Sequence, residues 1–498
     1  MLIVFQLLMI SETYGQSGTF NMAKSLPYPQ GDFYHMIEYQ DTIVGYGIGF
    51  NNNTEWKQGV AIAKLDSSGN VIAHNFILDE MGDLLATGQA WGNIIRTADG
   101  GFAAIAATVY RKSAFLIKMA NDLHVEFIKE YPDTVNLSNY FYNMIETPEG
   151  YLLFGAIQRP DFYDDGFIRY VDKQGETIWF SFVNYSDYSN GVVSLERLSD
   201  NLYIYGIVSG VTPSSSNSSF HLIDTDGNIF TSLITLPEPE IGYLRKIIPL
   251  ANGDILAYGL KVIEVINNSK RVQSTLSKLD SNFHVEWVRH FGRVSSLNAS
   301  VILWDFAPAI DGHYIGAGET LVKDGNDPTR RTGWLYKFST DGDSIWERKI
   351  NAPFLPLYYT NSGFFAGVGV LGSGNIIAGG STNEGNTQYC WLVKVTNDGC
   401  LDTLFCQPAT AVTQPQNRQW QELDIYPIPA SSGFNITYST EIIQVSLLDT
   451  QGNLLLKQQN SGTTASIDLP TSLPNGFYFA EIQDKNGYSI RKKICVVK

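Results

Sequence analysis

The chain has 498 residues and a net charge of −16, and its composition narrows both its class and its partners. Aromatic residues make up 13% of the chain and charged residues only 17%, with 45 glycines. This balance is typical of an extracellular all-β protein with ample material for a core. Nucleic acids and anionic membranes bind proteins through clustered Lys and Arg, so the acidic balance predicts no nucleic-acid partner.

Residues 1–15 are predicted to be a signal peptide, because the apolar run from Leu2 to Ile10 is followed by small and polar residues. The run is too short to anchor the chain as a transmembrane helix, and no later stretch reaches that length. We therefore expect cleavage near Gly15, export, and no transmembrane anchor.

Residues 18–407 contain a unit of about 50–60 residues that recurs about seven times. In each unit a turn leads into a Gly-rich apolar strand. The turns begin at Asp41, Asp99, Glu149, Asp200, Asn252, Asp311 and Ser373. A third strand and a second Gly-containing turn follow, because Asp, Asn and Gly suit hairpins that need positive φ. The fourth strand often carries a large aromatic residue (Phe127, Trp179, Trp287 and Trp346). Four strands per unit predict a β-propeller of seven blades, with six or eight as the alternatives.

Residues 18–24 look like a fourth strand that lacks the other three strands of its unit. Pairing of this segment with the last unit would close the ring and remove an exposed sheet edge. Residues 400–406 are the alternative source of the missing strand.

The cysteines Cys400 and Cys406 flank a short loop and are predicted to form a disulfide in an oxidising compartment. A metal pair is the alternative, but the spacing matches no zinc pattern and no His-rich partner lies nearby. Cys390 and Cys495 are expected to be free.

The repeats carry no sequence signature of catalysis, since no HExxH, GxSxG or P-loop occurs. Alternating oxygens over residues 224–228 resemble a calcium loop. Other units hold Ser-Ser-Gly-Asn or Asn-Asp-Gly-Cys at the same place, so hairpin chemistry is preferred and calcium is the alternative. We predict no catalytic residue, no cofactor and no metal site.

A separate C-terminal β-sandwich is predicted over residues 423–498, after a linker at residues 408–422 that is rich in Thr, Gln and Pro. Four features define it. They are the entry with Tyr426, Pro427 and Pro429, the turn from Asp449 to Gly452, the strand with Gly476, Tyr478 and Phe479, and the basic end with Lys492, Lys493 and Lys498.

These features resemble the type A C-terminal sorting domain of proteins that the type IX secretion system of Bacteroidetes exports. Ile428 departs from the Asn that this family usually has between the two prolines. The resemblance implies that the domain engages the secretion machinery, crosses the periplasm and outer membrane, and leaves the protein secreted or at the cell surface. The repeats resemble the Gly-rich propeller repeats of secreted Bacteroidetes proteins, a similarity that specifies fold rather than activity.

We therefore expect an exported protein whose propeller is a non-catalytic module that binds an unknown glycan or protein. The alternative is a carbohydrate-active enzyme, a glycoside hydrolase or lyase, with acidic residues in the propeller channel. Two or three Asp or Glu side chains converging at one mouth of the channel would favour the enzyme.

Overall fold

The computed structural model describes residues 19–24, 30–39, 42–51, 57–87, 94–132, 138–183, 189–210, 217–237, 242–266, 269–291, 301–322, 330–353, 363–384, 387–401, 423–427, 430–449, 454–485 and 489–497. Every regular element in these ranges is a strand, and they contain no helix. The chain divides into two compact units, residues 1–412 and 413–498. The predicted signal peptide and linker lie outside the described residues.

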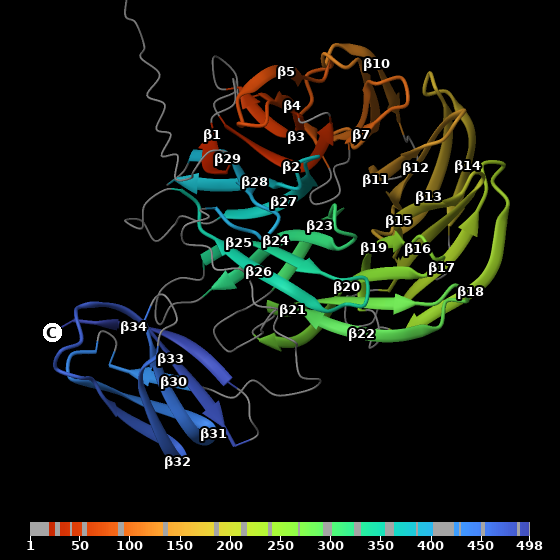
Figure 1. Ribbon diagram of the computed structural model, residues 1–498. Helices are drawn as coiled ribbons and strands as arrows, with labels where there is room; N and C mark the ends of the chain where they lie inside the picture. Colours follow the sequence, from red (N-terminus) through yellow and green to blue (C-terminus); the bar gives the residue numbers. More distant parts are fainter. Residues whose placement is uncertain are drawn as a thin grey trace, which may run out of the picture. The chain divides into compact units, whose positions relative to one another are not determined.

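The first unit is a ring of seven blades that follow one another along the chain, six of four strands and one, blade 2, of five (Figure 1). Blade 1 has β2 (Gln30–Tyr39), β3 (Thr42–Asn51), β4 (Lys57–Leu65) and β5 (Val71–Ile77). Blade 2 has β6 (Leu85–Ala86) and β7 (Ile94–Arg96), which both pair with β8 (Phe102–Thr108), then β9 (Ala114–Met119) and β10 (Val125–Tyr131). Blade 3 has β11 (Ser138–Glu146), β12 (Gly150–Gln158), β13 (Asp164–Asp172) and β14 (Thr177–Val183).

Blades 4 to 7 repeat this order. Blade 4 has β15 (Asn190–Ser199), β16 (Leu202–Ser209), β17 (Asn217–Ile223) and β18 (Ile229–Pro237), and blade 5 has β19 (Tyr243–Pro249), β20 (Ile255–Ile266), β21 (Ser269–Leu279) and β22 (Val285–Phe291). Blade 6 has β23 (Val301–Pro308), β24 (Tyr314–Val322), β25 (Arg330–Phe338) and β26 (Ser344–Ile350), and blade 7 has β27 (Gly363–Val370), β28 (Ile376–Glu384), β29 (Thr387–Val395) and β1 (Phe20–Lys24). The prediction of an all-β chain with a seven-bladed propeller is confirmed.

The core of the propeller lies between the blades. Each of seven clusters of buried apolar residues joins one blade to its neighbour, and together they run once around the ring. Both faces of a blade are therefore buried, which explains strands such as β8 in which every residue is buried. The hydrophobic effect favours each of these contacts by roughly 25 cal/mol per Å² of apolar surface removed from water.

The ring closes through the N-terminal strand. β1 pairs antiparallel with β29, from Phe20 opposite Lys394 to Lys24 opposite Cys390. The Nε1 of Trp391 donates a hydrogen bond of 2.7 Å to the Asn21 side chain. Phe20 is 4% exposed in the cluster between blades 7 and 1. The predicted closure by residues 18–24 is confirmed over Phe20–Lys24, and the outer position beside β29 is taken by β1 rather than by residues 400–406.

The aromatic residues of the outer strands fasten each blade to the next. Trp179 of β14 donates a 2.7 Å hydrogen bond to the carbonyl of Thr225, in the turn between the third and fourth strands of blade 4. Trp346 of β26 donates at 3.3 Å to the carbonyl of Asn397, in the matching turn of blade 7. These tryptophans, which the sequence marked only as large residues, are contacts between blades.

Two of the acidic residues that open the turns before the second strands, Asp99 and Asp311, pair with lysines of the third strands. The Nζ of Lys118 lies 2.9 Å from Asp99, and that of Lys337 lies 2.6 Å from Asp311. Lys337 also donates to Asn397 of blade 7. Both lysines are buried, so the acidic turn residue compensates a charge that burial would otherwise make costly.

The second unit is a small β-sandwich-like domain around its own core. It has β30 (Leu423–Tyr426), β31 (Gly433–Leu448), β32 (Leu454–Asp468), β33 (Gly476–Asp484) and β34 (Ser489–Val496). β31 pairs with β30, β32 and β33, and β34 lies beside β33. Sixteen buried residues form its core. The predicted C-terminal β-sandwich is confirmed.

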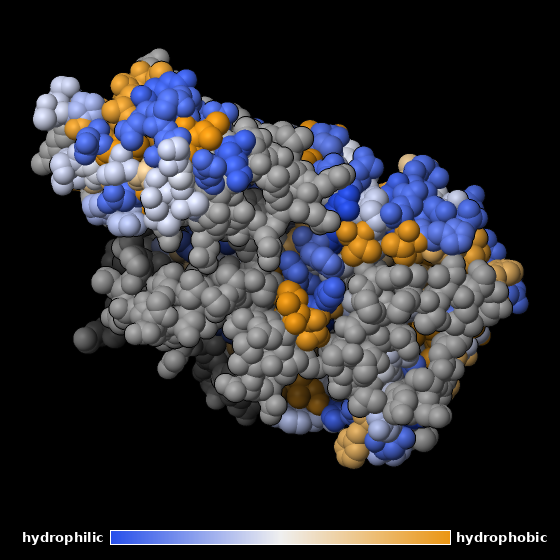
Figure 2. Space-filling view, turned by 90° about the horizontal axis from the view of Figure 1, so that it is seen from below, coloured by the Kyte–Doolittle hydropathy of each residue, from blue (hydrophilic) through white to orange (hydrophobic). Residues whose placement is uncertain are grey.

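The surface is mostly hydrophilic where the described residues can be seen. On the face in Figure 2, hydrophobic residues occur in small groups between hydrophilic ones. This mixture fits a water-exposed surface.

Replacement of Phe20 by alanine tests the ring closure. We expect Phe20→Ala to lower the free energy of unfolding by about 3–4 kcal/mol, because it leaves a cavity between blades 7 and 1. Urea denaturation would measure the change. Ile72→Ala is the matched control, since Ile72 lies on the outer strand of blade 1 and is 55% exposed. An equal, small effect of both substitutions would contradict the closure.

Candidate functional site

The innermost strands of six blades each contain a β-bulge at the same level of the ring. In each of them one residue has no partner on the second strand. The extra residues are Tyr34, Tyr142, Val193, Arg245, Trp304 and Ala366. In blade 2 the inner position is divided between β6 and β7. Bulges re-aim side chains and increase local twist, so this level of the channel presents side chains that a regular strand would direct elsewhere.

Glycines of the second strands make the bulges possible. Gly155 and Gly318 stand opposite the residue that precedes the bulge in blades 3 and 6. A Cβ on either glycine would lie 1.9 Å from a carbonyl oxygen of the inner strand, that of Tyr140 or Ile302. The Gly-rich second strand in the repeat therefore has a physical cause, which is close approach of the bulged backbone.

A cavity of about 40 Å³ opens at this level of the channel. Its lining comes from inner strands of six blades and from one residue of β20. The lining residues are His35, Asn143, Val193, Ser194, Arg245, Lys246, Tyr258, Leu303, Trp304, Asp305, Phe306 and Ala366. Most of them are the bulged residues or the residues that follow them. We call this cavity the channel pocket.

Two residues that follow a bulge accept hydrogen bonds from backbone amides of the next blade. The Ser194 hydroxyl accepts from the amide of Ile247 at 3.0 Å. Asp305 accepts from the amide of Val368 at 3.1 Å and from that of Phe306 at 2.8 Å. An inner strand has no neighbour on its channel side, so these side chains satisfy backbone groups that would otherwise be unpaired. The polar side chains of Ser194 and Asp305 therefore have a structural role in addition to lining the pocket.

A charged group connects blades 1, 5 and 6 in the channel pocket. Lys246 Nζ lies 3.2 Å from Asp305 Oδ1, and His35 Nδ1 lies 3.7 Å from Asp305 Oδ2. Burial lowers the pKa of His35, although Asp305 opposes the shift, so the imidazole is neutral at pH 7. Burial also disfavours the Lys246 cation, but the carboxylates of Asp305 and Glu196 outweigh this and raise its pKa.

Glu196 of β15 is the second carboxyl group near Lys246. Burial raises its pKa to about 7, and Lys246 only partly offsets the shift. Its side chain is half-buried, but the surrounding protein removes much of the water that would stabilise the charge. Glu196 therefore carries a proton for much of the time at neutral pH, whereas Asp305 has the hydrogen bonds of a carboxylate.

Arg245 and Trp304 bring a cation and an aromatic system together in the same pocket. The Cζ of Arg245 lies 4.9 Å from the ring centre of Tyr243 and 5.9 Å from that of Trp304. Burial lowers the pKa of Arg245, and the groups that oppose this shift are tyrosines rather than carboxylates. The indole Nε1 of Trp304 is buried and has no hydrogen-bond partner. Such a donor costs about 1–3 kcal/mol until an acceptor reaches it.

The lining combines one carboxylate with several hydrogen-bond donors. Among the described lining residues Asp305 is the one carboxylate, and both of its oxygens accept hydrogen bonds from the protein. Glycoside hydrolysis requires two carboxyl groups that flank a bond. Arg245, Lys246 and Trp304 supply donor groups to the same pocket.

The predicted sorting-domain residues lie in the second unit. Tyr426 and Pro427 are exposed at the end of β30, Gly476 begins β33, and Lys492 is exposed on β34. Tyr478 is buried and donates to the carbonyl of Pro474 at 2.8 Å. The remaining described positions are Asp449 at the end of β31, Phe479 on β33 and Lys493 on β34, while Pro429, Gly452 and Lys498 lie outside the described residues.

Cys400 is a disulfide cysteine, whereas Cys390 and Cys495 form no disulfide. Cys406 lies outside the described residues, so its pairing with Cys400 stays a prediction.

The calcium-like segment is a hairpin turn held by its first residue. Asp224 accepts hydrogen bonds from the amides of Asp226 and Asn228 at 3.0 and 2.8 Å, and from the Asn228 side chain. Asp280 of blade 5 accepts from two amides of its own turn in the same way. The described residues contain no cluster of three or more groups that could hold a metal ion.

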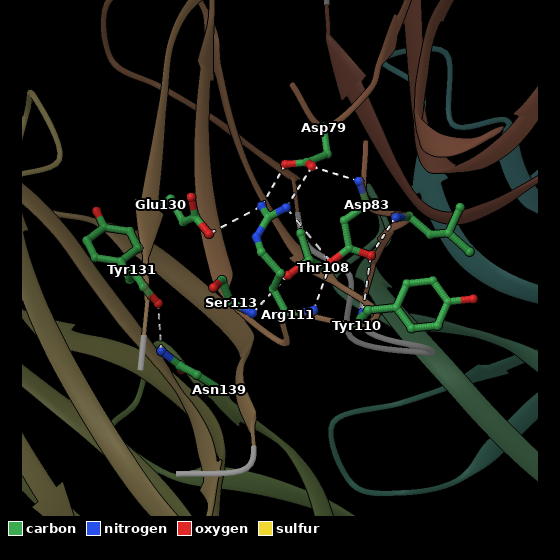
Figure 3. A network of polar contacts seen from close by, with 10 residues as sticks. Asp79, Asp83, Thr108, Tyr110, Arg111, Ser113, Glu130, Tyr131 and Asn139 are labelled. Atoms are coloured by element: carbon green, nitrogen blue, oxygen red, sulfur yellow. Dashed lines mark hydrogen bonds and ion pairs between the residues drawn. The ribbon is translucent and has the colours of Figure 1, made fainter. Parts of the chain in front are cut away.

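Another charged cluster, outside the channel, has a structural explanation. Arg111 makes two hydrogen bonds of 2.8 Å to Asp79 and one of 3.3 Å to Glu130 (Figure 3). Asp83 accepts from the amides of Tyr110 and Arg111. These contacts fix the connection from blade 1 to blade 2 against a hairpin loop of blade 2.

Sequence reasoning missed Arg245, Lys246, Trp304 and Asp305, although a positional signal exists. Every bulged residue stands seven positions before the residue that opens the following turn, as Arg245 does before Asn252 and Trp304 before Asp311. Residue type varies freely at this position, so no motif marks it.

Residues 424–497 match the family model described as "Secretion system C-terminal sorting domain". The second unit is a type IX sorting domain. This domain indicates export of the chain to the cell surface or outside the cell. No described segment forms a helix with the length and hydropathy needed to cross a membrane.

The search of curated proteins found no match. Among solved structures, the chain is similar to PorZ of Porphyromonas gingivalis, an essential bacterial surface component of the type IX secretion system. The two sequences are 7% identical, the match covers 95% of this chain and 99% of that chain, and the TM-score is 0.20. It is also similar to a subtype N10 neuraminidase-like protein of a little yellow-shouldered bat strain, with 9% identity, coverage of 68% and 99%, and a TM-score of 0.37. A Synechocystis apocarotenoid oxygenase variant has 11% identity, coverage of 78% and 96%, and a TM-score of 0.39. These TM-scores are too low to carry an argument about function.

Replacement of Gly318 tests the role of close approach at the bulges. Gly318→Ala should lower the free energy of unfolding by about 3 kcal/mol, because the added Cβ forces β23 and β24 apart. Gly191→Ala is the control, since the nearest atom to its Cβ would be 3.5 Å away, and it should change stability by less than about 1 kcal/mol. Equal urea unfolding midpoints for the Gly318→Ala and Gly191→Ala variants would contradict the role of close approach at the bulges.

Replacement of Glu196 by glutamine tests the pKa shift through stability. Glu196 ionises near pH 4.3 in an unfolded chain and near pH 7 in the folded one, so the stability it contributes falls as pH rises between these values. Relative to the native chain, Glu196→Gln should therefore gain about 1–3 kcal/mol at pH 8 compared with pH 4.5. Urea denaturation at both pH values measures this, with Glu149→Gln on an exposed turn as control. A pH-independent difference would refute the assignment.

Proposed function

We propose that the chain is an exported binding protein whose propeller holds a ligand in the channel pocket without catalysing a reaction. The sorting domain at residues 424–497 supports the route of export, together with the predicted signal peptide at residues 1–15. On this proposal the sorting domain engages the type IX secretion machinery. The propeller then meets its ligand, a glycan or a protein, at the cell surface or outside the cell.

The observation that carries the binding role is the set of groups in the channel pocket. Arg245, Lys246 and Trp304 offer donors, and aromatic rings form part of the wall. Ligand sites are commonly concave and furnished with a few convergent polar groups. The bulges hold these side chains on strands rather than on loops, which favours a preformed site.

A second candidate function, a glycoside hydrolase or lyase, is favoured by one observation. Glu196, whose pKa is raised to about 7, shares the neighbour Lys246 with Asp305. A carboxyl group whose pKa is raised towards neutral pH, close to a second carboxyl group, is a common feature of acid and base catalysis. The two functions differ in one measurable respect, which is whether a bound saccharide stays intact.

Removal of residues 423–498 tests the export route. In the native host we expect the full-length chain to appear outside the cell and the shortened chain to remain in the periplasm. Immunoblots of cell fractions and mass spectrometry of the exported form would measure location and processing. Protease resistance of the retained propeller is the control for folding, because the propeller and the sorting domain form separate cores. Unchanged export of the shortened, folded chain would overturn this proposal.

A further inference from the structure

We infer that the outer edge of β14 in blade 3 is a self-association surface, where two copies of the chain pair antiparallel about a two-fold axis at Ser181. This inference does not depend on the ligand of the channel pocket. It is carried by three features of β14: its free backbone edge, its neutral middle residue and its exposed aromatic side chain.

The backbone of β14 has one side available for pairing. β14 is the last strand of its sheet, and no other described strand pairs with its outer side. On its inner side the stretch Trp179–Val183 pairs regularly with β13, whereas Ile178 has no partner on β13 and forms a bulge. The stretch Trp179–Val183 therefore offers a regular row of backbone donors and acceptors to an incoming strand.

The middle residue of this stretch distinguishes blade 3 from blades 2, 5 and 6. The equivalent position holds Lys129 in β10, Arg289 in β22 and Arg348 in β26. In a symmetric antiparallel pair the middle residue lies opposite its own copy, and like charges placed directly opposite each other are destabilising. Charged residues on edge strands oppose pairing with other chains in this way. Blade 3 has the small, neutral Ser181 at this position, and β14 contains no Asp, Glu, Lys or Arg.

Exposed apolar side chains distinguish β14 from the remaining outer strands. Blades 1 and 7 also have a neutral middle residue, Asn75 in β5 and Met22 in β1. Among the described residues, however, β14 is the one outer strand with two large apolar side chains that are at least half exposed. They are Ile178 at 54% and Phe182 at 50%. An apolar, uncharged edge strand is the type that pairs with another chain.

A two-fold axis at Ser181 makes the surface complementary to itself. It places Phe180 of one copy opposite Phe182 of the other, and it does so twice. Within β14 the two rings lie 4.8 Å apart in an edge-to-face contact. Phe180 also contacts Phe167 and Arg169 of β13, which hold its ring in place. The pairing removes Phe182 from water, adds two aromatic cross-strand pairs and satisfies the backbone of the edge.

Sedimentation equilibrium of the full chain tests the inference. Two five-residue strands form a small interface, so we expect a weak dimer. The average mass should rise from monomer towards dimer between about 1 and 300 µM protein. The measurement is made at an ionic strength of about 0.15 M, because salt screens the repulsion between two chains of net charge −16.

Substitutions of Ser181 test the two-fold axis. Ser181→Lys and Ser181→Glu should each weaken the dimer at least about fivefold, because like charges then face each other on the axis. An equimolar mixture of the two variants should recover association, since the mixed pair brings opposite charges together. The Lys and Arg residues of blades 2, 5 and 6 show that a blade accommodates a long side chain at this position. Ile128→Lys is the matched control, since Ile128 is 41% exposed on the outer strand of blade 2, and it should leave the dimer unchanged.

Three results would contradict the inference. A monomer at every concentration would show that the edge of β14 does not self-associate. A dimer that neither Ser181 variant weakens would place the interface elsewhere on the chain. Weakening by both variants without recovery in the mixture, with native unfolding midpoints in urea, would overturn the two-fold axis at Ser181.

Discussion

The propeller depends on burial of both faces of every blade. Each cluster of core residues belongs to two neighbouring blades, so no blade can complete its core alone. A linear array would leave one apolar face exposed at each end, and the pairing of β1 with β29 removes both ends. The outer tryptophans reinforce the contacts between blades, and so does the hydrogen bond from Lys337 of blade 6 to Asn397 of blade 7. The stability of the ring therefore depends on all seven interfaces between neighbouring blades.

Closure of the ring also creates the functional geometry. Inner strands that meet around an axis have no hydrogen-bonding neighbour on the channel side, and bulges relieve their crowding by re-aiming side chains. Polar residues such as Ser194 and Asp305 then satisfy backbone amides, while Arg245 and Trp304 line the pocket. The scaffold and the candidate site thus share one set of residues, and the role of each is defined by the hydrogen bonds it makes.

Local chemistry made much of the fold predictable from the sequence. Turn residues such as Asp99 and Asp311 and the glycines near them recur because hairpins and close strand approach require them, and the ring-closing segment was visible as an unaccompanied strand. The sorting domain was recognisable from the residues around Tyr426, Gly476 and Lys492. The channel pocket was not predictable, because it assembles residues from six repeats at positions where residue type varies. The pKa shift of Glu196 depends on the same long-range packing.

The central claim is that the bulged level of the channel is where the ligand binds. A crystal structure of the full chain grown with a mixture of neutral and acidic oligosaccharides tests this claim most directly. We predict density for part of a saccharide in the channel pocket, with one of its oxygens within hydrogen-bond distance of Trp304 Nε1. Density for the saccharide at the outer loops, with the pocket holding only water, would contradict the account.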